Sequence, residues 1–287
     1  MKIQVCNMRK LIIIFLLICA GESATAKAPV TEQAARPSTK TYALIVSGIN
    51  KDPGEQRIKD EAVTELRRFF LNNAKAEPNQ LDVLVDRHSS VAGKNSKIST
   101  AKNLKTTMDS LAQIVKPEDR FVFYYVGQAN VVADNLRFNL PGEDVTNVKP
   151  AEWISRIKAA SILIVLDCPG ATLAAKSMAG RGRIVICACK TEQHNSTQFS
   201  RYFVPALTDN KSDTNTDGKI SLLEAFTSAS KQLDDLYRRQ QLFKTETPLL
   251  EDNGDGLPSP QPWRYKLDGK DGFVASNFYF GRNNQKK

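Results

Sequence analysis

The middle of the chain alternates short apolar runs with amphipathic segments, and this pattern constrains the fold more than any other feature of the sequence. Parallel strands joined by helical crossovers produce such a pattern, because the strands are buried on both faces while each helix buries only one side. The runs that predict strands are 42–47, 81–85, 120–126, 161–166 and 183–189, and the segments with helical spacing are 58–73, 104–115 and 153–157. The sequence therefore predicts one α/β domain with a mainly parallel central sheet flanked by helices.

The N-terminal part of the chain has the pattern of an export signal. Basic residues precede an unbroken apolar run over 11–20, and the small residues of Ala24-Thr25-Ala26 follow it. We therefore predict a signal peptide over 1–26 and a mature protein that is secreted or periplasmic. No membrane span is expected, since a spanning helix needs about twenty apolar residues. Residues 27–40 contain two prolines and no apolar periodicity, which predicts a flexible leader.

Residues 213–224 fit a calcium-binding loop. They match the pattern D-x-[DN]-x-[DN]-G-x₅-E at each specified position. Calcium takes six to eight oxygen ligands, and this spacing supplies them from six residues. The predicted Ca²⁺ ligands are Asp213, Asn215, Asp217, the carbonyl group of Lys219, Ser221 and a bidentate Glu224. The alternative is a polar turn in which Asp, Asn and Gly serve only the backbone bends.

Apolar residues at helical spacing flank this loop on both sides, over 199–207 and from 221 to about 243. They predict an EF-hand-like helix-loop-helix over 199–250. A single loop has no second loop to pair with, so we expect it to brace the structure and not to act as a sensor. The expected divisions are then an α/β domain over 41–198, this unit, and a C-terminal segment over 251–287 that packs on the domain or is partly disordered.

Residues 251–256, Glu-Asp-Asn-Gly-Asp-Gly, repeat the front half of a calcium loop. The twelfth position of such a loop would be Pro262, which offers no carboxylate. A glycine-rich turn is therefore the expectation here, with metal binding as the alternative.

Charge and cysteine content argue against several classes of function. The formal net charge is +9, but the basic residues are scattered among acids, so no nucleic-acid surface is predicted. After the signal is removed, Cys168, Cys187 and Cys189 remain, which allows at most one disulfide and favours buried thiols. The two histidines are isolated and the three cysteines lack CxxC spacing, so the sequence matches no zinc-binding pattern. Residues 48–54 have neither the GxGxxG nor the Walker spacing of a phosphate-binding loop.

Two predicted strand ends carry motifs that suggest a family. Tyr124-Tyr125-Val126-Gly127-Gln128-Ala129 closes the third strand, and Val165-Leu166-Asp167-Cys168-Pro169-Gly170 closes the fourth. The chain resembles the caspase and legumain-like cysteine peptidases, which place a histidine in a Tyr-Ser-Gly-His-Gly type motif and a cysteine in an Asp-x-Cys-x-x-Gly type motif at these points. It is most similar to exported bacterial members of that group. The segments that carry this similarity are 138–146, Glu192-Gln193, Tyr202-Phe203, the calcium loop and 252–256. The resemblance implies a caspase-like three-layer sandwich with a C-terminal calcium segment.

The catalytic motifs depart from the family's pattern. Gln128 stands where the catalytic histidine belongs, and a carboxamide exchanges no proton near neutral pH. Cys168 lies one position before the family's nucleophile, in a motif that is two residues shorter. His88 and His194 both lie outside the matching motif and are expected to be solvated loop residues.

Three functions are compatible with these observations. The first is a pseudo-peptidase that binds a peptide or protein partner without cleaving it, at the degenerate dyad positions Gln128 and Cys168. The second is an active cysteine endopeptidase that uses Cys168 with a non-standard base. The third is a structural or interaction protein in which Ca²⁺ only stabilises the fold.

Overall fold

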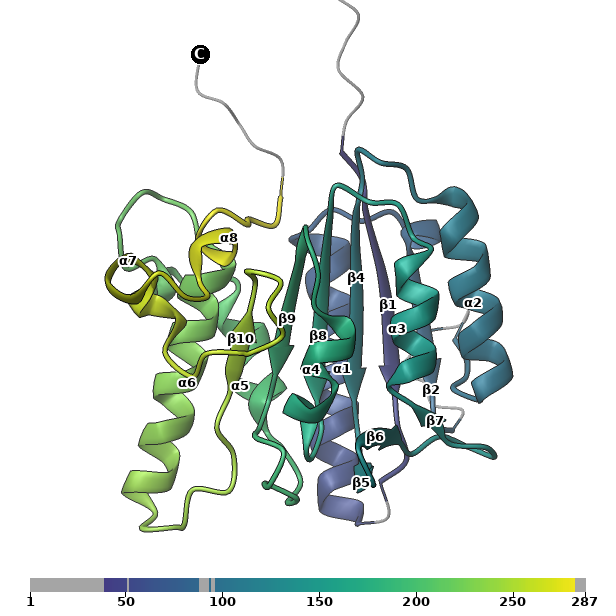
Figure 1. Cartoon of the computed structure of the whole chain (residues 1–287), viewed down its shortest axis with the longest axis horizontal. Helices are drawn as coiled ribbons and strands as arrows, with labels where there is room; N and C mark the ends of the chain where they lie inside the picture. The colour runs from purple at the N-terminus through teal and green to yellow at the C-terminus, as the bar shows by residue number, and fades with distance from the viewer. Residues whose placement is uncertain (1–38, 51, 88–92, 94–95, 282–287) are drawn as a thin grey trace, which may run out of the picture. The chain divides into compact units, whose positions relative to one another are not determined.

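A seven-stranded sheet lies at the centre of the structure (Figure 1). The computed structural model describes residues 39–50, 52–87, 93 and 96–281, which belong to one compact unit. The strand order is β10-β9-β8-β4-β1-β2-β3, and each pair is parallel except β10 with β9. The strands are β1 (Thr41–Ser47), β2 (Leu81–Val85), β3 (Lys97–Ile98), β4 (Arg120–Val126), β8 (Ser161–Asp167), β9 (Arg183–Cys187) and β10 (Leu249–Glu251). The predicted mainly parallel sheet is confirmed.

All five predicted strands form, with small shifts at their ends. β1 begins one residue earlier, at Thr41, and β8 runs one residue further, to Asp167. β9 ends at Cys187, two residues before the predicted end. The two strands of this sheet that the sequence did not predict are β3 and β10, which have two and three residues and lie at its opposite edges.

Helices cover both faces of the sheet, which gives three layers (Figure 1). One face packs against α2 (Ala101–Ile114), α3 (Val148–Ser155) and α4 (Ala175–Met178). The other face packs against α1 (Pro53–Asn72), α5 (Phe199–Ala206) and α6 (Leu222–Arg239). Alternation along the strands supplies both cores, because Phe121 and Phe123 of β4 face the first group while Val122 and Tyr124 face the second.

The remaining elements are short. A separate three-stranded antiparallel sheet follows β4, and two single-turn helices follow β10. They are β5 (Ala129–Val132), β6 (Asn135–Phe138), β7 (Val145–Thr146), α7 (Tyr265–Asp268) and α8 (Phe273–Ser276).

Local caps set where the long helices begin and end. The Thr100 hydroxyl accepts a hydrogen bond from the Asn103 amide at 3.2 Å and so caps the start of α2. A capping box between Ser221 and Glu224 starts α6 at the end of the predicted calcium loop. α6 stops at Arg239, before the expected end near 243, and Gln241 just beyond it takes a φ of 54°.

The segments that follow β9 pack on the same central sheet. α5 and α6 lie over the face that α1 also covers, and β10 extends the central sheet next to β9. Several parts of the chain lie outside the described residues. They are the expected signal peptide over 1–26, most of the expected leader over 27–40, His88, and residues 282–287 at the C-terminal end. Among the helices that are described, none is long and apolar enough to cross a membrane.

Two glycines bring the ends of β1 and β4 into close contact. A Cβ atom on Gly127 would lie 2.7 Å from the Gly48 backbone, and one on Gly48 would lie 2.0 Å from the Tyr125 hydroxyl. Gly127 also has a φ of +152°, which side chains rarely adopt. The Gly48 amide donates to the Val126 carbonyl at 2.9 Å, so the two strand ends remain paired up to this point. Glycine at both positions therefore fixes the backbone that leads into Gln128.

We predict that Gly127→Ala lowers the free energy of unfolding by about 2–4 kcal/mol, because it adds both a steric overlap and an unfavourable φ. Gly142→Ala is the matched control, since Gly142 has a φ of +82° but no atom within 4 Å of an added Cβ. That control is expected to lose only about 1–2 kcal/mol. Urea denaturation of both variants measures the difference, and equal losses would contradict the close-packing argument.

Candidate functional site

A cavity of about 760 Å³ opens at the carboxyl ends of the central parallel strands. Ligand sites in open α/β sheets commonly lie at this edge, and the volume is in the range of ligand pockets, about 300–1,000 Å³. The last residues of β4 and β8, Val126 and Asp167, line this cavity, as do Gly127 and Gln128, which follow β4. The other lining residues include Glu55, Ile58 and Lys59 of α1, residues 194–198 of the loop before α5, Tyr237 near the end of α6, and Leu242 and Phe243 beyond it.

Gln128 lies in this cavity, held by two neighbours. Its Nε2 amide donates to Glu55 Oε2 at 3.0 Å and to the Ser196 hydroxyl. Ser196 in turn donates to Glu55 Oε1, so the carboxylate, the hydroxyl and the amide form a closed triangle. Both amide hydrogens of Gln128 are therefore used in orienting the side chain, and the group supplies no proton carrier.

Asp167 is the second strand-end residue in the cavity. Its Oδ2 atom accepts hydrogen bonds from the Ser200 amide, at 2.8 Å, and from the Ser200 hydroxyl. The Tyr124 hydroxyl completes the network at 2.7 Å from Ser200 Oγ. Burial raises the pKa of the Asp167 carboxyl, and the hydrogen bonds from Ser200 partly offset this rise. The other oxygen, Oδ1, has no hydrogen-bond partner among the described residues.

A second buried carboxyl lies behind the same wall of the cavity. Glu246 is fully buried and its Oε2 accepts from the Gln198 amide at 2.9 Å. Burial, and after it the charge of Asp167, raises the pKa of Glu246 well above its usual value. Glu246 is thus linked to the cavity through the backbone of Gln198, which lines it.

Lys59 forms part of the floor of the cavity. Its Nζ donates to the Gly48 carbonyl at 2.6 Å and pairs with Asp86 at 2.9 Å, while the side chain is 2% exposed. Desolvation lowers the pKa of Lys59, and the hydrogen bond and charge of Asp86 act against that shift. Both strand ends, of β1 and β2, are thereby tied to α1.

The structure does not bring Cys168 into the cavity. Asp167 faces the cavity, and the next residue points to the opposite face of the sheet, where Cys168 is fully buried with the residues that pack against α2 and α3. Burial raises the pKa of the Cys168 thiol well above its usual value, and the nearby Cys189, Asp167 and Cys187 raise it further. His194 lines the cavity from an exposed loop position. Of the expected dyad positions, only Gln128 is part of the site.

The predicted calcium loop folds around its own polar side chains. Asp213 accepts hydrogen bonds from the amides of Asp217 and Gly218, at 3.2 and 2.9 Å, and Asn215 accepts from the Asp217 amide at 2.9 Å. Gly218 has a φ of +80°, as the sharp turn of such a loop requires. The side chains at the first, third and fifth loop positions therefore gather on the inner side of the turn.

Glu224 closes the loop at its twelfth position. Its Oε1 accepts from the Thr214 and Asn215 amides at 3.0 and 3.1 Å, and its Oε2 accepts from the Ser221 amide at 2.9 Å. These hydrogen bonds lower the pKa of Glu224 although burial acts to raise it. The donor set fits Ca²⁺, since all the side chains offer oxygen. The acids of this loop are less closely gathered than Glu251, Asp255 and Asp271, whose ligand atoms all lie within 4.8 Å of one another.

The loop is joined to the sheet through the C-terminal segment. Ser221 forms an antiparallel bridge with Tyr279, and the Leu222 amide donates to the Phe278 carbonyl at 2.8 Å. Arg120, the first residue of β4, donates to the Tyr279 carbonyl at 2.5 Å. The loop therefore lies at the amino ends of the parallel strands, roughly 20 Å from the cavity along the seven-residue β4.

Sequence reasoning missed the partners of the predicted residues. Glu55 and Ser196, which hold Gln128, are 141 positions apart, and no local pattern marks either of them. Asp271, which lies beside the 251–256 fragment, was missed for the same reason.

Comparison of the chain with protein-family models found no match, and neither did comparison with curated proteins.

We predict that Cys168 resists alkylation in the native protein. Iodoacetamide at pH 8 is expected to modify it at least about 100-fold more slowly than a free thiol, because burial both blocks access and keeps the thiol protonated. Burial also raises the pKa of Cys189 to about 12. Mass spectrometry of the labelled peptides measures the rate. Denaturant should make Cys168, Cys187 and Cys189 all reactive, and fast labelling of native Cys168 would contradict the buried position.

Proposed function

We propose that this chain is an exported, calcium-binding protein with a caspase/legumain-like fold, which binds an extended peptide without cleaving it. One observation carries the proposal. The cavity at the strand ends holds the Gln128 amide where a peptidase of that family needs an acid–base group, and the thiol at Cys168 faces the opposite side of the sheet. The cavity offers space for a peptide, and no cysteine thiol is among the described residues that line it, while the imidazole of His194 lines it from an exposed loop and not from the position of the family's histidine.

The family assignment rests on the two strand ends together with the sheet. β4 and β8 are adjacent and parallel, so the histidine-type and cysteine-type motifs end at the same edge. This is the arrangement that the resemblance implies for a peptidase cleft. Glutamine at the position of the family's histidine then favours the hypothesis of binding over that of cleavage.

The rim of the cavity supports a peptide as ligand. Phe243 is 95% exposed and Leu242 is 54% exposed, although both are large apolar side chains. They stand beside the cavity, together with the polar groups of Gln128 and Asp167. An apolar rim over a floor with donors and acceptors suits a peptide, whose side chains pack on the rim while its backbone finds hydrogen bonds.

The calcium loop supports a bracing role within the same proposal. It lies at the amino end of α6, and the cavity residue Tyr237 lies near the carboxyl end of that helix. An ion bound by Asp213, Asn215, Asp217, the Lys219 carbonyl, Ser221 and Glu224 would supply the positive charge that fixes the loop. These residues would then hold the start of α6 against the Tyr279 segment and β4.

We predict that the mature chain binds extended peptides selected from a random display library, and that Phe243→Ser weakens this binding about 5–30-fold, as expected for loss of an exposed aromatic anchor. Calorimetry measures the affinity. Phe273→Ser is the matched control, because Phe273 is 64% exposed but does not line the cavity, and its affinity should be unchanged.

The same peptides should remain intact during long incubation with the protein, as judged by mass spectrometry. Turnover that disappears in Cys168→Ala would overturn the proposal in favour of an active cysteine endopeptidase. Failure to retain any peptide would favour a purely structural role.

We also predict that removing Ca²⁺ with a chelator lowers the melting temperature by about 5–10 °C from its value at 100 times the Kd, since such binding contributes about 2.7 kcal/mol. Differential scanning calorimetry measures the shift. Glu224→Gln should lose most of the shift that this loop provides, because the amide keeps the capping geometry but removes the bidentate acid. Glu61→Gln, an exposed acid of α1, should keep it. An unchanged shift in Glu224→Gln would argue that the loop is only a polar turn.

A further inference from the structure

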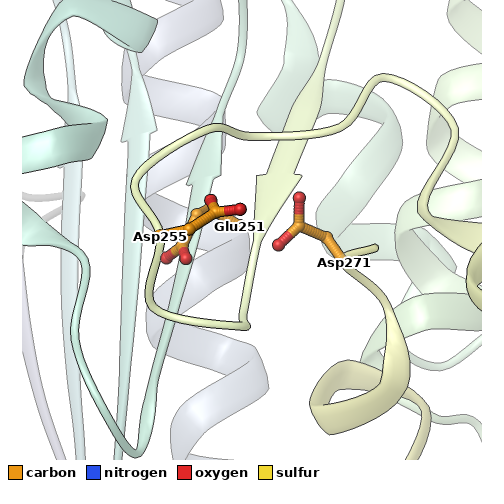
Figure 2. Close-up of side chains that lie close together, drawn as sticks. All are labelled: Glu251, Asp255 and Asp271. Atoms are coloured by element: carbon orange, nitrogen blue, oxygen red, sulfur yellow. The ribbon is translucent and has the colours of Figure 1, made fainter. Parts of the chain in front are cut away.

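A second group of acidic side chains gathers at the far edge of the sheet (Figure 2). Glu251 ends β10, Asp255 lies in the loop that follows, and Asp271 comes from the segment before α8. One ligand oxygen from each lies within 4.8 Å of the others. Figure 2 shows the Asp271 carboxylate pointing across the gap toward the other two side chains. Oxygen atoms around one calcium ion, at 2.3–2.6 Å from it, are separated by at most about 5 Å.

Two of the carboxylates have a buried oxygen with no partner, which the clustering alone does not require. Glu251 is 0% exposed and Asp271 is 1% exposed. Glu251 Oε2 and Asp271 Oδ2 accept no hydrogen bond from any described residue. Their other oxygens are used, since Glu251 Oε1 accepts from the Gly254 amide at 2.5 Å and Asp271 Oδ1 accepts from the Asp252 amide at 2.9 Å. Each side chain is therefore anchored by one oxygen and leaves the second one free.

The backbone around the cluster is fixed by neighbouring groups. Asp252 accepts from the Gly272 and Ala275 amides at 2.8 and 2.7 Å, which ties the loop to the start of α8. Leu250 and Ser259 form a bridge that closes the loop behind the acids. Gly256 has a φ of +75°, and a Cβ there would lie 2.9 Å from the Lys176 backbone. The three acids are held in place by these contacts before any ligand arrives.

No described basic side chain forms an ion pair with these three acids. A buried, unpaired carboxylate is unfavourable, and two of them close together are more so. A bound cation would compensate the negative charge and would use the free oxygens at the same time.

We infer that Glu251, Asp255 and Asp271 form a second calcium site, separate from the 213–224 loop. The exposed Asp255 leaves a way in for the ion. The ligands are hard oxygen donors, which suit Ca²⁺ and not the softer transition metals. Asp271 supplies the carboxylate that Pro262 cannot supply at the twelfth position of the truncated loop motif. Water and backbone carbonyl groups complete the six to eight ligands that Ca²⁺ takes.

Calcium binding to the full mature chain tests the inference by counting sites. In equilibrium dialysis with Ca²⁺ at pH 7.5, the unmodified protein should bind two ions. Asp213→Asn combined with Glu224→Gln removes the loop site and should leave one. Asp271→Asn, and independently Glu251→Gln, should each also leave one, because each removes a negatively charged ligand. The amide oxygen keeps the hydrogen bond that anchors the side chain, so the fold should be preserved. Asp268→Asn, an exposed acid three positions earlier, should retain two.

Stability measurements add a readout that does not depend on counting. Asp271→Asn should melt at a higher temperature than the unmodified protein in chelator, because it removes a buried negative charge, and should gain less from added Ca²⁺. The inference is overturned if the loop-disabled protein binds no Ca²⁺, or if Asp271→Asn and Glu251→Gln both still bind two ions. A loop-disabled protein that still binds two ions would instead refute calcium binding by the 213–224 loop, so the two sites fail separately.

Discussion

Parallel pairing of the central strands is the constraint on which the rest of the structure depends. Because β1, β4 and β8 run in the same direction, their carboxyl ends meet at one edge and build a common cavity. Successive residues of a strand face opposite sides of the sheet, so Asp167 faces the cavity while the adjacent Cys168 is buried on the other side. The close approach of Gly48, which follows β1, and Gly127, which follows β4, fixes the backbone at the same ends of the strands. The chemistry available at the site is thus a consequence of strand direction and parity.

The opposite edge of the sheet carries the acidic groups. The 213–224 loop is joined to the first residue of β4 through Tyr279. Glu251 pairs with Val185 in the middle of β9, and Gly254 just after it lies near Gly180 and Arg181, which precede that strand. Both acidic clusters therefore lie at the amino ends of the parallel strands, away from the cavity. An ion at either place touches no residue of the cavity directly. The elements that connect the 213–224 loop with the cavity are α6, which begins at the loop and carries Tyr237 near its other end, and β4, which runs from Arg120 to Val126.

Sequence patterns predicted the central sheet because its strands are buried on both faces and therefore read as continuous apolar runs. They did not predict β10, since three residues carry no periodicity and the strand forms only where β9 offers an edge. The position of Gln128 at a strand end was predictable, but its partners were not, because Glu55 and Ser196 meet only after the chain has folded. Asp271 joins Glu251 for the same reason, since Asp252 and α8 close that loop in three dimensions.

Under the proposed resemblance to cysteine peptidases, Gln128 stands where an imidazole would be expected, and this difference bears more on the chemistry of the cavity than on its shape. An amide orients by hydrogen bonds just as an imidazole does, and Glu55 and Ser196 satisfy both of its hydrogens. Acid–base catalysis requires a group that gains and loses a proton near neutral pH, whereas peptide recognition requires only shape, donors and acceptors. A cavity without the first could therefore still provide the second. Since α6 carries Glu224 near one end and Tyr237 near the other, an ion bound as proposed would, if it ordered the helix, also reduce the entropy that a peptide would lose on binding. Linkage makes that effect reciprocal, so a bound peptide would tighten the hold on calcium by the same factor.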